Sequence, residues 1–166
     1  NTENRNDIDL ISIGLACEDG RTYYAISTEF DLNGCEWWLQ QNVLTKLSGF
    51  DAGSKTSVWK SRGQIAEDIR NVLCSDREAP QIWGYFASYD WVAFCQLFGG
   101  MLHLPSRVPQ YIMDIRQRMT DLGVKRSRLP KQPEETRHHA LHDAVWEINA
   151  LKHMDTLWQS APRVSV

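Results

Sequence analysis

The sequence predicts an α/β domain in which a mixed β-sheet is flanked by helices. Residues 8–17 and 21–29 are apolar, β-rich runs, and the Glu-Asp-Gly sequence at 18–20 between them is typical of a hairpin turn. Residues 81–86 form another apolar run of strand length. Segments with apolar side chains at helical spacing lie between and after these runs. This order of elements favours one sheet covered by helices.

Two helices are expected in the first half of the chain. Residues 35–47 carry apolar side chains at helical spacing. Ser61 is followed three residues later by Gln64, and this spacing predicts a capping box at the start of a helix that ends near Cys74.

The strand over residues 81–86 leads into a third helix. Ser88 is a suitable cap for a helix over residues 91–98, and Asp90 then falls in the first turn, at the carboxyl end of the strand. Ligands in α/β sheets bind at this end of the strands. A carboxylate in the first turn also stabilises a helix through its dipole, without any role in a site. Both interpretations of Asp90 are open at this point.

Two helices are expected in the last third of the chain. Residues 110–122 predict a helix that ends at Gly123, because glycine adopts the left-handed conformation that terminates many helices. Asp114 on this helix is interpreted as lying outside the site. Residues 139–157 predict a longer helix. Its core-facing side chains are expected to be Leu141, Val145, Ile148 and Leu151 or Lys152.

The composition fits a single domain over residues 1–166. No apolar run approaches the roughly 18 residues of a membrane-spanning helix, and no secretory leader is recognisable, so we expect a soluble, cytoplasmic protein without membrane partners. The four cysteines are far apart and lack Cys-x-x-Cys spacing. We interpret them as reduced thiols and not as zinc ligands.

The most informative motif is His138 followed five residues later by Asp143, since it pairs a possible general base with a possible metal-ligand carboxylate. On an unbroken helix five residues turn through about 500°, so the two side chains would point about 140° apart. They converge if His138 lies on the loop before the helix. A polar helix start with an ordinary solvated carboxylate is the alternative.

Aromatic side chains surround Asp90 in the sequence. Such rings stack nucleobases in some proteins and fill the core in most. The residues are Tyr85, Phe86, Tyr89, Trp91 and Phe94. Tyr89 and Trp91 are the candidates for contact with a substrate.

Four basic side chains lie within seven residues before His138: Lys125, Arg126, Arg128 and Lys131. The net charge of −3 argues against a basic coat over the whole surface. The loop is either an ordinary solvated segment or an arm that steers phosphates toward His138, with binding that weakens as salt rises.

These motifs resemble a known family. Tyr89-Asp90 followed by His138-x-x-x-x-Asp143 resembles the second and third motifs of the DEDDh 3′-5′ exonucleases, the DnaQ-like branch of the RNase H-like fold. The stretches at 8–14, 23–30 and 88–99 are similar, more narrowly, to the RNase AS subfamily of mycobacterial-type exoribonucleases. The resemblance runs from about Ile8 to Leu151.

The resemblance implies an RNase H-like fold and hydrolysis of the terminal phosphodiester of single-stranded RNA from its 3′ end, with release of nucleoside monophosphates. Asp90 and Asp143 would bind Mg²⁺ or Mn²⁺, and His138 would be the general base. A homodimer is also implied. His139 would share the helix face of Asp143, as a structural partner or a substrate contact, whereas His142 would point into solvent.

One part of the family pattern, an Asp-x-Glu pair on the first strand, has no counterpart upstream of Ile8 in this sequence. Glu29 in Ser-Thr-Glu-Phe is not a substitute, because it ends a later strand. Two Mg²⁺ ions about 4 Å apart repel by roughly 17 kcal/mol at an effective dielectric of about 20, so two metals require concentrated negative charge. We therefore expect the complete enzyme to bind two metals, and the 166-residue sequence as given, with Asp90 and Asp143 alone, to bind at most one metal well and to have little activity.

Truncation of the sequence and natural loss of the pair are both consistent with this departure, and we favour truncation. Three alternatives to an exoribonuclease stay open: a DNA-directed 3′-5′ exonuclease, a catalytically defective module that only binds nucleic acid or nucleotide, and a structural scaffold.

Overall fold

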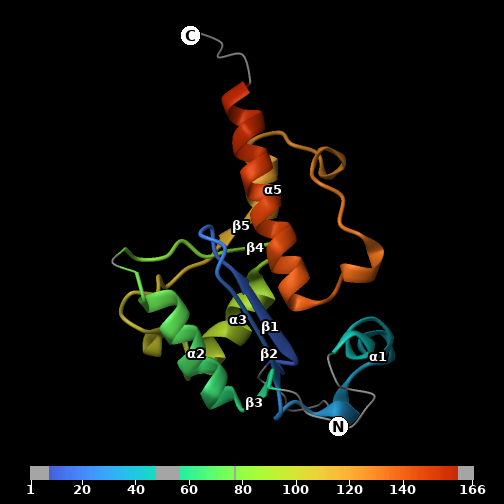
Figure 1. Ribbon diagram of the computed structural model, residues 1–166, viewed down its shortest axis with the longest axis vertical. Coiled ribbons are helices and arrows are strands. Elements are labelled where there is room, and N and C mark those ends of the chain that lie inside the picture. Colours follow the sequence, from blue (N-terminus) through green and yellow to red (C-terminus); the bar gives the residue numbers. More distant parts are fainter. Residues whose placement is uncertain (1–7, 48–56, 77, 161–166) are drawn as a thin grey trace.

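The computed structural model describes residues 8–47, 57–76 and 78–160. These ranges contain five strands in two small sheets and five α-helices (Figure 1), so the mixed α/β class is confirmed, whereas the strands are divided between two sheets and do not form the predicted single one. The strands are β1 (Ser12–Ala16), β2 (Thr22–Ser27), β3 (Trp59–Lys60), β4 (Trp83–Gly84) and β5 (Met113–Asp114). The α-helices are α1 (Trp37–Asn42), α2 (Arg62–Cys74), α3 (Ser88–Leu97), α4 (Ile115–Asp121) and α5 (Ala140–Ser160). None of the helices in these ranges combines the length and the apolar character needed to cross a membrane.

The predicted hairpin is present. β1 and β2 pair in antiparallel fashion, and Gly20 in the connecting turn has a φ of +91°, a conformation that glycine adopts without strain. β3 pairs in parallel with β2, so this sheet is mixed. The predicted capping box is also present, because the Ser61 side chain accepts the Gln64 N–H while Gln64 Oε1 accepts the Ser61 N–H.

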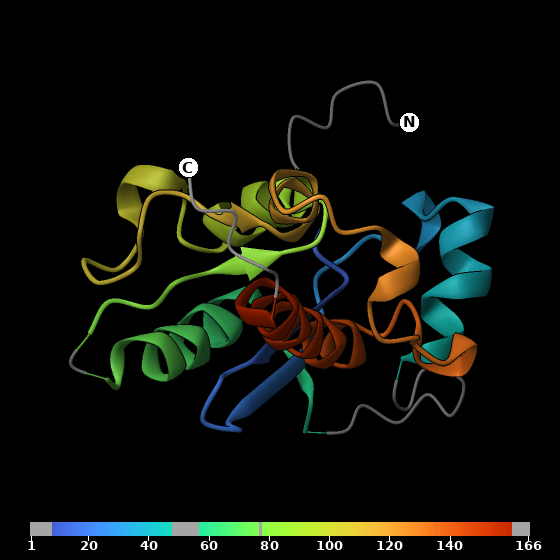
Figure 2. The same ribbon diagram turned by 90° about the horizontal axis from the view of Figure 1, so that it is seen from above.

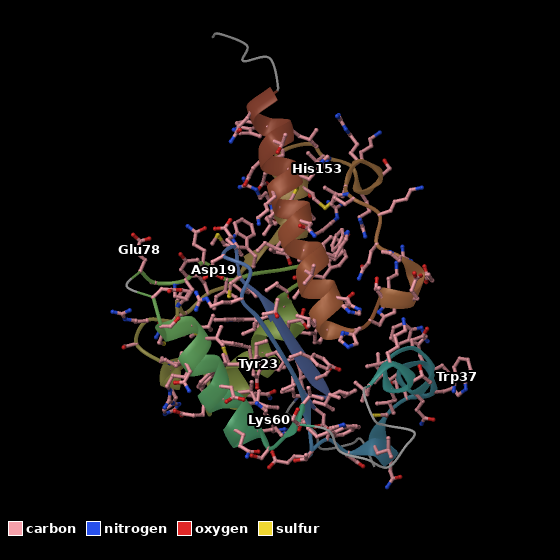
Figure 3. The ribbon with its side chains drawn as sticks, viewed as in Figure 1. Asp19, Tyr23, Trp37, Lys60, Glu78 and His153 are labelled. Carbon is pink, nitrogen blue, oxygen red and sulfur yellow. The ribbon has the colours of Figure 1, made fainter. Side chains whose placement is uncertain are left out.

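A polar cluster joins the hairpin to α2. Tyr23 and Lys60 lie side by side in Figure 3, with the Lys60 ammonium 5.5 Å from the Tyr23 ring centroid. Both side chains donate to the Asp68 carboxylate. Ala25, Ile65 and Phe94 belong to one buried cluster, against which Tyr23 also packs. α2 and α3 therefore pack on the face of the hairpin that carries Tyr23.

β4 and β5 form a separate parallel pair, which begins where the Met113 N–H donates to the Ile82 carbonyl at 2.9 Å. The helix predicted over residues 110–122 is therefore wrong in its first half. α4 begins at Ile115 because the Asp114 carboxylate caps it by accepting the Gln117 N–H at 3.0 Å.

The start of α3 also differs from the prediction. Ser88 is the first residue of the helix and not its cap; the preceding Ala87 carbonyl accepts the Trp91 N–H at 2.8 Å. Asp90 lies in the first turn of α3, as predicted.

The fully buried side chains of α5 are not the predicted ones, although the predicted Leu151 packs against them. The buried side chains are Trp146, Ala150 and Met154, whereas Val145 is 37% exposed. These three pack with α4 and with Leu129 of the loop between α4 and α5. The apolar residues of α5 occupy more than one face, so periodicity alone chose the wrong one.

At its N-terminal end α5 lies directly on β1. A Cβ built on Gly14 would stand 2.4 Å from the backbone of Ala140 and Leu141, closer than any side chain allows. Gly14 therefore brings the first turn of α5 onto the sheet, on the face opposite α2 and α3.

Candidate active site

A cavity of about 740 Å³ lies between the two sheets. β1 and β4 form its walls, together with the start of α3 and the first two turns of α5. The carboxylates that line it are Asp90, Asp143 and Glu147.

Asp90 reaches this cavity from the first turn of α3. Its pKa is raised above the usual value for an aspartate, first by loss of solvent around the carboxylate and second by the nearby negative charge of Asp143. The two carboxylates predicted from the sequence therefore share one cavity and repel each other.

Asp143 reaches the cavity from the first turn of α5. Its backbone N–H donates to the His139 carbonyl at 2.9 Å, and its Oδ1 accepts a hydrogen bond from Gln132 Nε2 at 2.6 Å. Gln132 thus orients the carboxylate from the loop before the helix.

His138 lies on the loop immediately before α5 and lines the same cavity. Its φ of +62° is in the left-handed region, which bends the chain sharply ahead of the helix. The exposed imidazole packs edge-on to Trp38, with the ring centroids 5.0 Å apart. The loop position that would let His138 and Asp143 converge is therefore the observed one.

α1 and the turn after it support this loop. Figures 1 and 2 both show α1 beside the segment that leads into α5. The Lys46 ammonium donates to the Glu134 carbonyl at 3.4 Å and also to the Arg137 carbonyl. The backbone just before His138 is thus held at a fixed place over the cavity.

Comparison with known proteins adds to this geometry. A family model described as the 3′-5′ exoribonuclease Rv2179c-like domain matches residues 1–155. The chain belongs to this family.

Two curated relatives, both from Mycobacterium tuberculosis, are named 3′-5′ exoribonuclease Rv2179c and 3′-5′ exoribonuclease MT2234.1. Each is 41% identical over 143 residues, which cover 86% of this chain and 81% of the relative. The predicted resemblance to a mycobacterial-type exoribonuclease is confirmed.

The three candidate substrate contacts occupy different places in this Rv2179c-like domain. Trp91 lines the cavity, with its ring stacked on Phe94 at a centroid distance of 5.3 Å. Tyr89 is 76% exposed and does not line the cavity. His139 also lies outside the lining, stacked between Tyr24 at 4.5 Å and His142 at 4.3 Å. Burial lowers the His139 pKa.

Glu147 is a site residue that sequence reasoning missed. It lies one helical turn after Asp143, and its Oε1 accepts the Tyr85 backbone N–H at 3.2 Å. Loss of solvent, together with the nearby charges of Asp90, Asp143 and Asp114, raises the pKa of Glu147 to about 8. The i, i+4 spacing of two acids was a detectable signal, but the wrong choice of core face hid it.

The basic loop contributes unevenly to the cavity. Arg126 lines it, together with Arg137, which was outside the predicted basic cluster. Lys125, Arg128 and Lys131 are exposed and do not line it. Leu129 anchors the loop in the core, and the Pro130 carbonyl accepts the Trp146 indole N–H at 2.8 Å.

The described residues do not bring three or more His, Cys, Asp or Glu side chains into an arrangement that could hold a metal ion. Asp90 and Asp143 share the cavity as a pair, and Glu147 is held by a backbone N–H. All four cysteines are free, and Cys95 is buried.

Proposed function

We propose that this chain is a metal-dependent 3′-5′ exoribonuclease of the RNase H-like fold, which hydrolyses the terminal phosphodiester of RNA and releases nucleoside monophosphates. Membership of the Rv2179c-like family supports the reaction class. The observation that carries the proposal is the convergence of Asp90, Asp143 and His138 on one cavity.

Asp90 and Asp143 would hold a Mg²⁺ or Mn²⁺ ion. Their mutual repulsion, which raises the Asp90 pKa, is the condition that a divalent cation relieves, and carboxylate oxygens are ligands that both metals prefer. Such an ion, when bound, neutralises charge on the phosphate and lowers the pKa of water. Gln132 would keep Asp143 in position, since its amide occupies one lone pair of Oδ1.

The cavity also supports the RNase H-like fold. The Ile11 carbonyl and the Cys17 N–H bond across to β2, so in an antiparallel ladder the backbone groups of Ser12 and Gly14 point the other way, toward the cavity. β4 presents Trp83 and Gly84 from the opposite wall. An extended segment with two carboxylates would fit between these edges, join the two sheets and supply the charge for a second metal.

His138 would accept the proton of the attacking water. His138 lies on the loop over the cavity, lines it, and is exposed beside Trp38. Histidine is the side chain that most often transfers a proton as a general acid or base. A homodimer and action on DNA stay predictions from the family resemblance.

The test compares His138→Ala with His142→Ala in the Mg²⁺-dependent shortening of a 5′-labelled RNA. Loss of a general base lowers turnover by about 10²–10⁴-fold. His138→Ala should therefore lose turnover while its metal affinity stays close to wild type. His142 is exposed and outside the cavity lining, so its replacement should change turnover little.

Equal turnover in the two variants would show that His138 is not the general base of the reaction. RNA binding by the wild-type chain without metal-dependent shortening would instead favour a catalytically defective binding module.

A further inference from the structure

A second cavity, of about 350 Å³, adjoins the carboxylate cavity, and Arg126 lines both. The charged side chains around it are Arg116, Lys125 and Arg126; no carboxylate lines it. The carboxylates thus line only the first of these two cavities, the charged residues of the second are all basic, and Arg126 lies at the boundary.

Arg126 is held at this boundary by two aromatic rings. Its guanidinium carbon lies 4.0 Å from the centroid of a Trp146 ring and 5.8 Å from that of Tyr85. A guanidinium stacked in this way keeps its charge and its N–H donors available at the edge. Arg126 is exposed, and no carboxylate among the described residues forms an ion pair with it.

The other two cations of the second cavity, Arg116 and Lys125, resemble Arg126 in being exposed and in having no ion-pair partner among the described residues. Arg116 Nη1 donates to the Thr120 hydroxyl at 3.0 Å, and Lys125 is exposed. No described carboxylate forms an ion pair with either. By contrast, Arg118 on the same helix as Arg116 pairs with Asp155 at 2.5 Å. The positive charge around the second cavity is therefore not neutralised by an ion pair with any carboxylate in the described part of the chain.

We infer that the second cavity binds the phosphodiester backbone of the RNA upstream of the terminal nucleotide. The inference rests on the proposed function, because it takes the 3′-terminal nucleotide to lie at Asp90 and Asp143. From there the strand would pass over Arg126, where a phosphate meets a planar donor, and continue between Arg116 and Lys125. Arginine forks and lysine ammonium groups are the groups that bind phosphate oxygens.

This path has two consequences for substrate choice. Backbone contacts do not read base identity, so the second cavity favours length over sequence. A dinucleotide contains one phosphodiester, which would lie at Asp90 and Asp143, so it offers none to the second cavity, whereas a decanucleotide has further phosphates upstream. Affinity should therefore rise with length beyond the terminal nucleotides.

The experiment measures equilibrium binding of a fluorescent dinucleotide and a fluorescent decanucleotide of RNA in EDTA, which prevents metal-dependent turnover. The variants are Arg126→Ala, Arg116→Ala and Lys125→Ala. Arg128→Ala is the matched control: Arg128 lies in the same short turn as Arg126 and carries the same charge, but it lines neither cavity.

Each of the three test variants should weaken decanucleotide binding by about 3–10-fold at low salt, and each lost phosphate contact should reduce the slope of log affinity against log salt by about 0.7. Dinucleotide binding by Arg116→Ala and Lys125→Ala should stay within about twofold, as should decanucleotide binding by Arg128→Ala. Arg126→Lys should fall between wild type and Arg126→Ala, because it keeps the charge and loses the flat stacking on Trp146.

Equal decanucleotide affinities for Arg126→Ala and Arg128→Ala would overturn the inference. So would a loss of dinucleotide affinity in Arg116→Ala or Lys125→Ala as large as the loss of decanucleotide affinity in the same variant. If Arg126→Ala fails to fold, Arg116→Ala and Lys125→Ala decide the matter in the same way. Mg²⁺-dependent shortening by the wild-type chain is assayed separately. Its absence, together with the expected binding pattern, would refute the proposed function and leave the path standing.

Discussion

Two residues other than glycine have a positive φ among the described residues: Phe86 at +57° and His138 at +62°. Phe86 lies shortly before α3, which carries Asp90, and His138 lies shortly before α5, which carries Asp143. Such conformations cost on the order of 1–3 kcal/mol each and collect at functional sites. Both helices that present the carboxylates are thus entered through a strained residue, which fixes the direction in which each helix leaves the cavity.

Glu147 is the carboxylate whose ionisation the fold opposes most clearly. Its pKa is raised from 4.5 to about 8, so the folded state favours the neutral acid. Below a pH of about 4.5 the Glu147 carboxyl is neutral in both the folded and the unfolded chain, and its burial costs no stability. As pH rises from about 4.5 toward about 8, the free energy of unfolding falls, because the unfolded chain releases the proton more readily than the folded one.

Glu147→Gln should therefore stabilise the protein in EDTA at pH 8, on the order of 2 kcal/mol, because glutamine keeps an acceptor for the Tyr85 N–H and cannot ionise. The advantage should shrink as pH falls and vanish near pH 4.5. Urea unfolding from pH 4 to pH 8 measures it.

Glu67→Gln is the control, since Glu67 is an exposed partner of Arg70 on α2. Its effect should stay below about 1 kcal/mol. If the difference in unfolding free energy between wild type and Glu147→Gln were the same at pH 4.5 and at pH 8, it would contradict the raised pKa of Glu147.

At the scale of elements, the contact of α5 with β1 sets the position of Asp143. Gly14 is the residue that permits it, because only a position without a Cβ allows the backbone of Ala140 and Leu141 to approach so closely. Asp143 lies in the same first turn of α5. Gly14 on β1 therefore determines how far the Asp143 side chain extends into the cavity.

Gly14→Ala should move the start of α5 away from the sheet and destabilise the protein by roughly 1–3 kcal/mol, the usual cost of overpacking a core. RNA turnover should fall together with stability, because Asp143 moves with the helix. Thermal unfolding and the shortening assay measure the two effects.

Gly63→Ala provides the opposite control. Gly63 lies in the first turn of α2, and the nearest atom to an added Cβ is the Ser61 hydroxyl at 4.0 Å. This change should stabilise the protein by about 0.5–1 kcal/mol and leave turnover unchanged. Equal effects of the two substitutions would show that α5 tolerates displacement from β1.

Local signals in the sequence were sufficient for several elements. The hairpin, the capping box of α2 and the end of α4 at Gly123 each depend on neighbouring residues, and all three are present. β5 was missed because two residues, Met113 and Asp114, form it, and their partner strand lies far away in the chain. No periodicity can report so short a strand.

The site residues divide in the same way, into those that local motifs predicted and those that depend on tertiary contacts. His138, Asp143 and Asp90 were predicted from motifs, and they do line one cavity. Glu147 and Arg126 acquire their meaning largely from tertiary contacts: Glu147 shares the cavity with Asp90, which is far away in the chain, and Arg126 stacks on Trp146. A single sequence does not contain these contacts.

At the scale of the whole molecule, the cavity lies where two sheets and two helices meet, so its carboxylates belong to different parts of the fold. Asp90 is on α3 and Asp143 is on α5, and these two helices pack on opposite faces of the hairpin. Their like charges push these parts apart in the absence of a cation. A bound cation would join them.

Metal binding should therefore stabilise the entire fold. A ligand that binds only the native state adds about 2.7 kcal/mol at 100 times its dissociation constant. We expect Mn²⁺ to raise the melting temperature of the wild-type protein, and EDTA to reverse the rise. Differential scanning calorimetry measures the change.

Asp90→Asn should have two opposite effects in the same experiment. Without metal it should be as stable as wild type or slightly more so, because a repulsion has been removed. With Mn²⁺ it should gain little, because one of the two ligands is lost. Asp121→Asn, which changes an aspartate outside both cavities, should keep the full gain. If Asp90→Asn gained as much as wild type, the ion would bind elsewhere, and the two helices would not be joined through it.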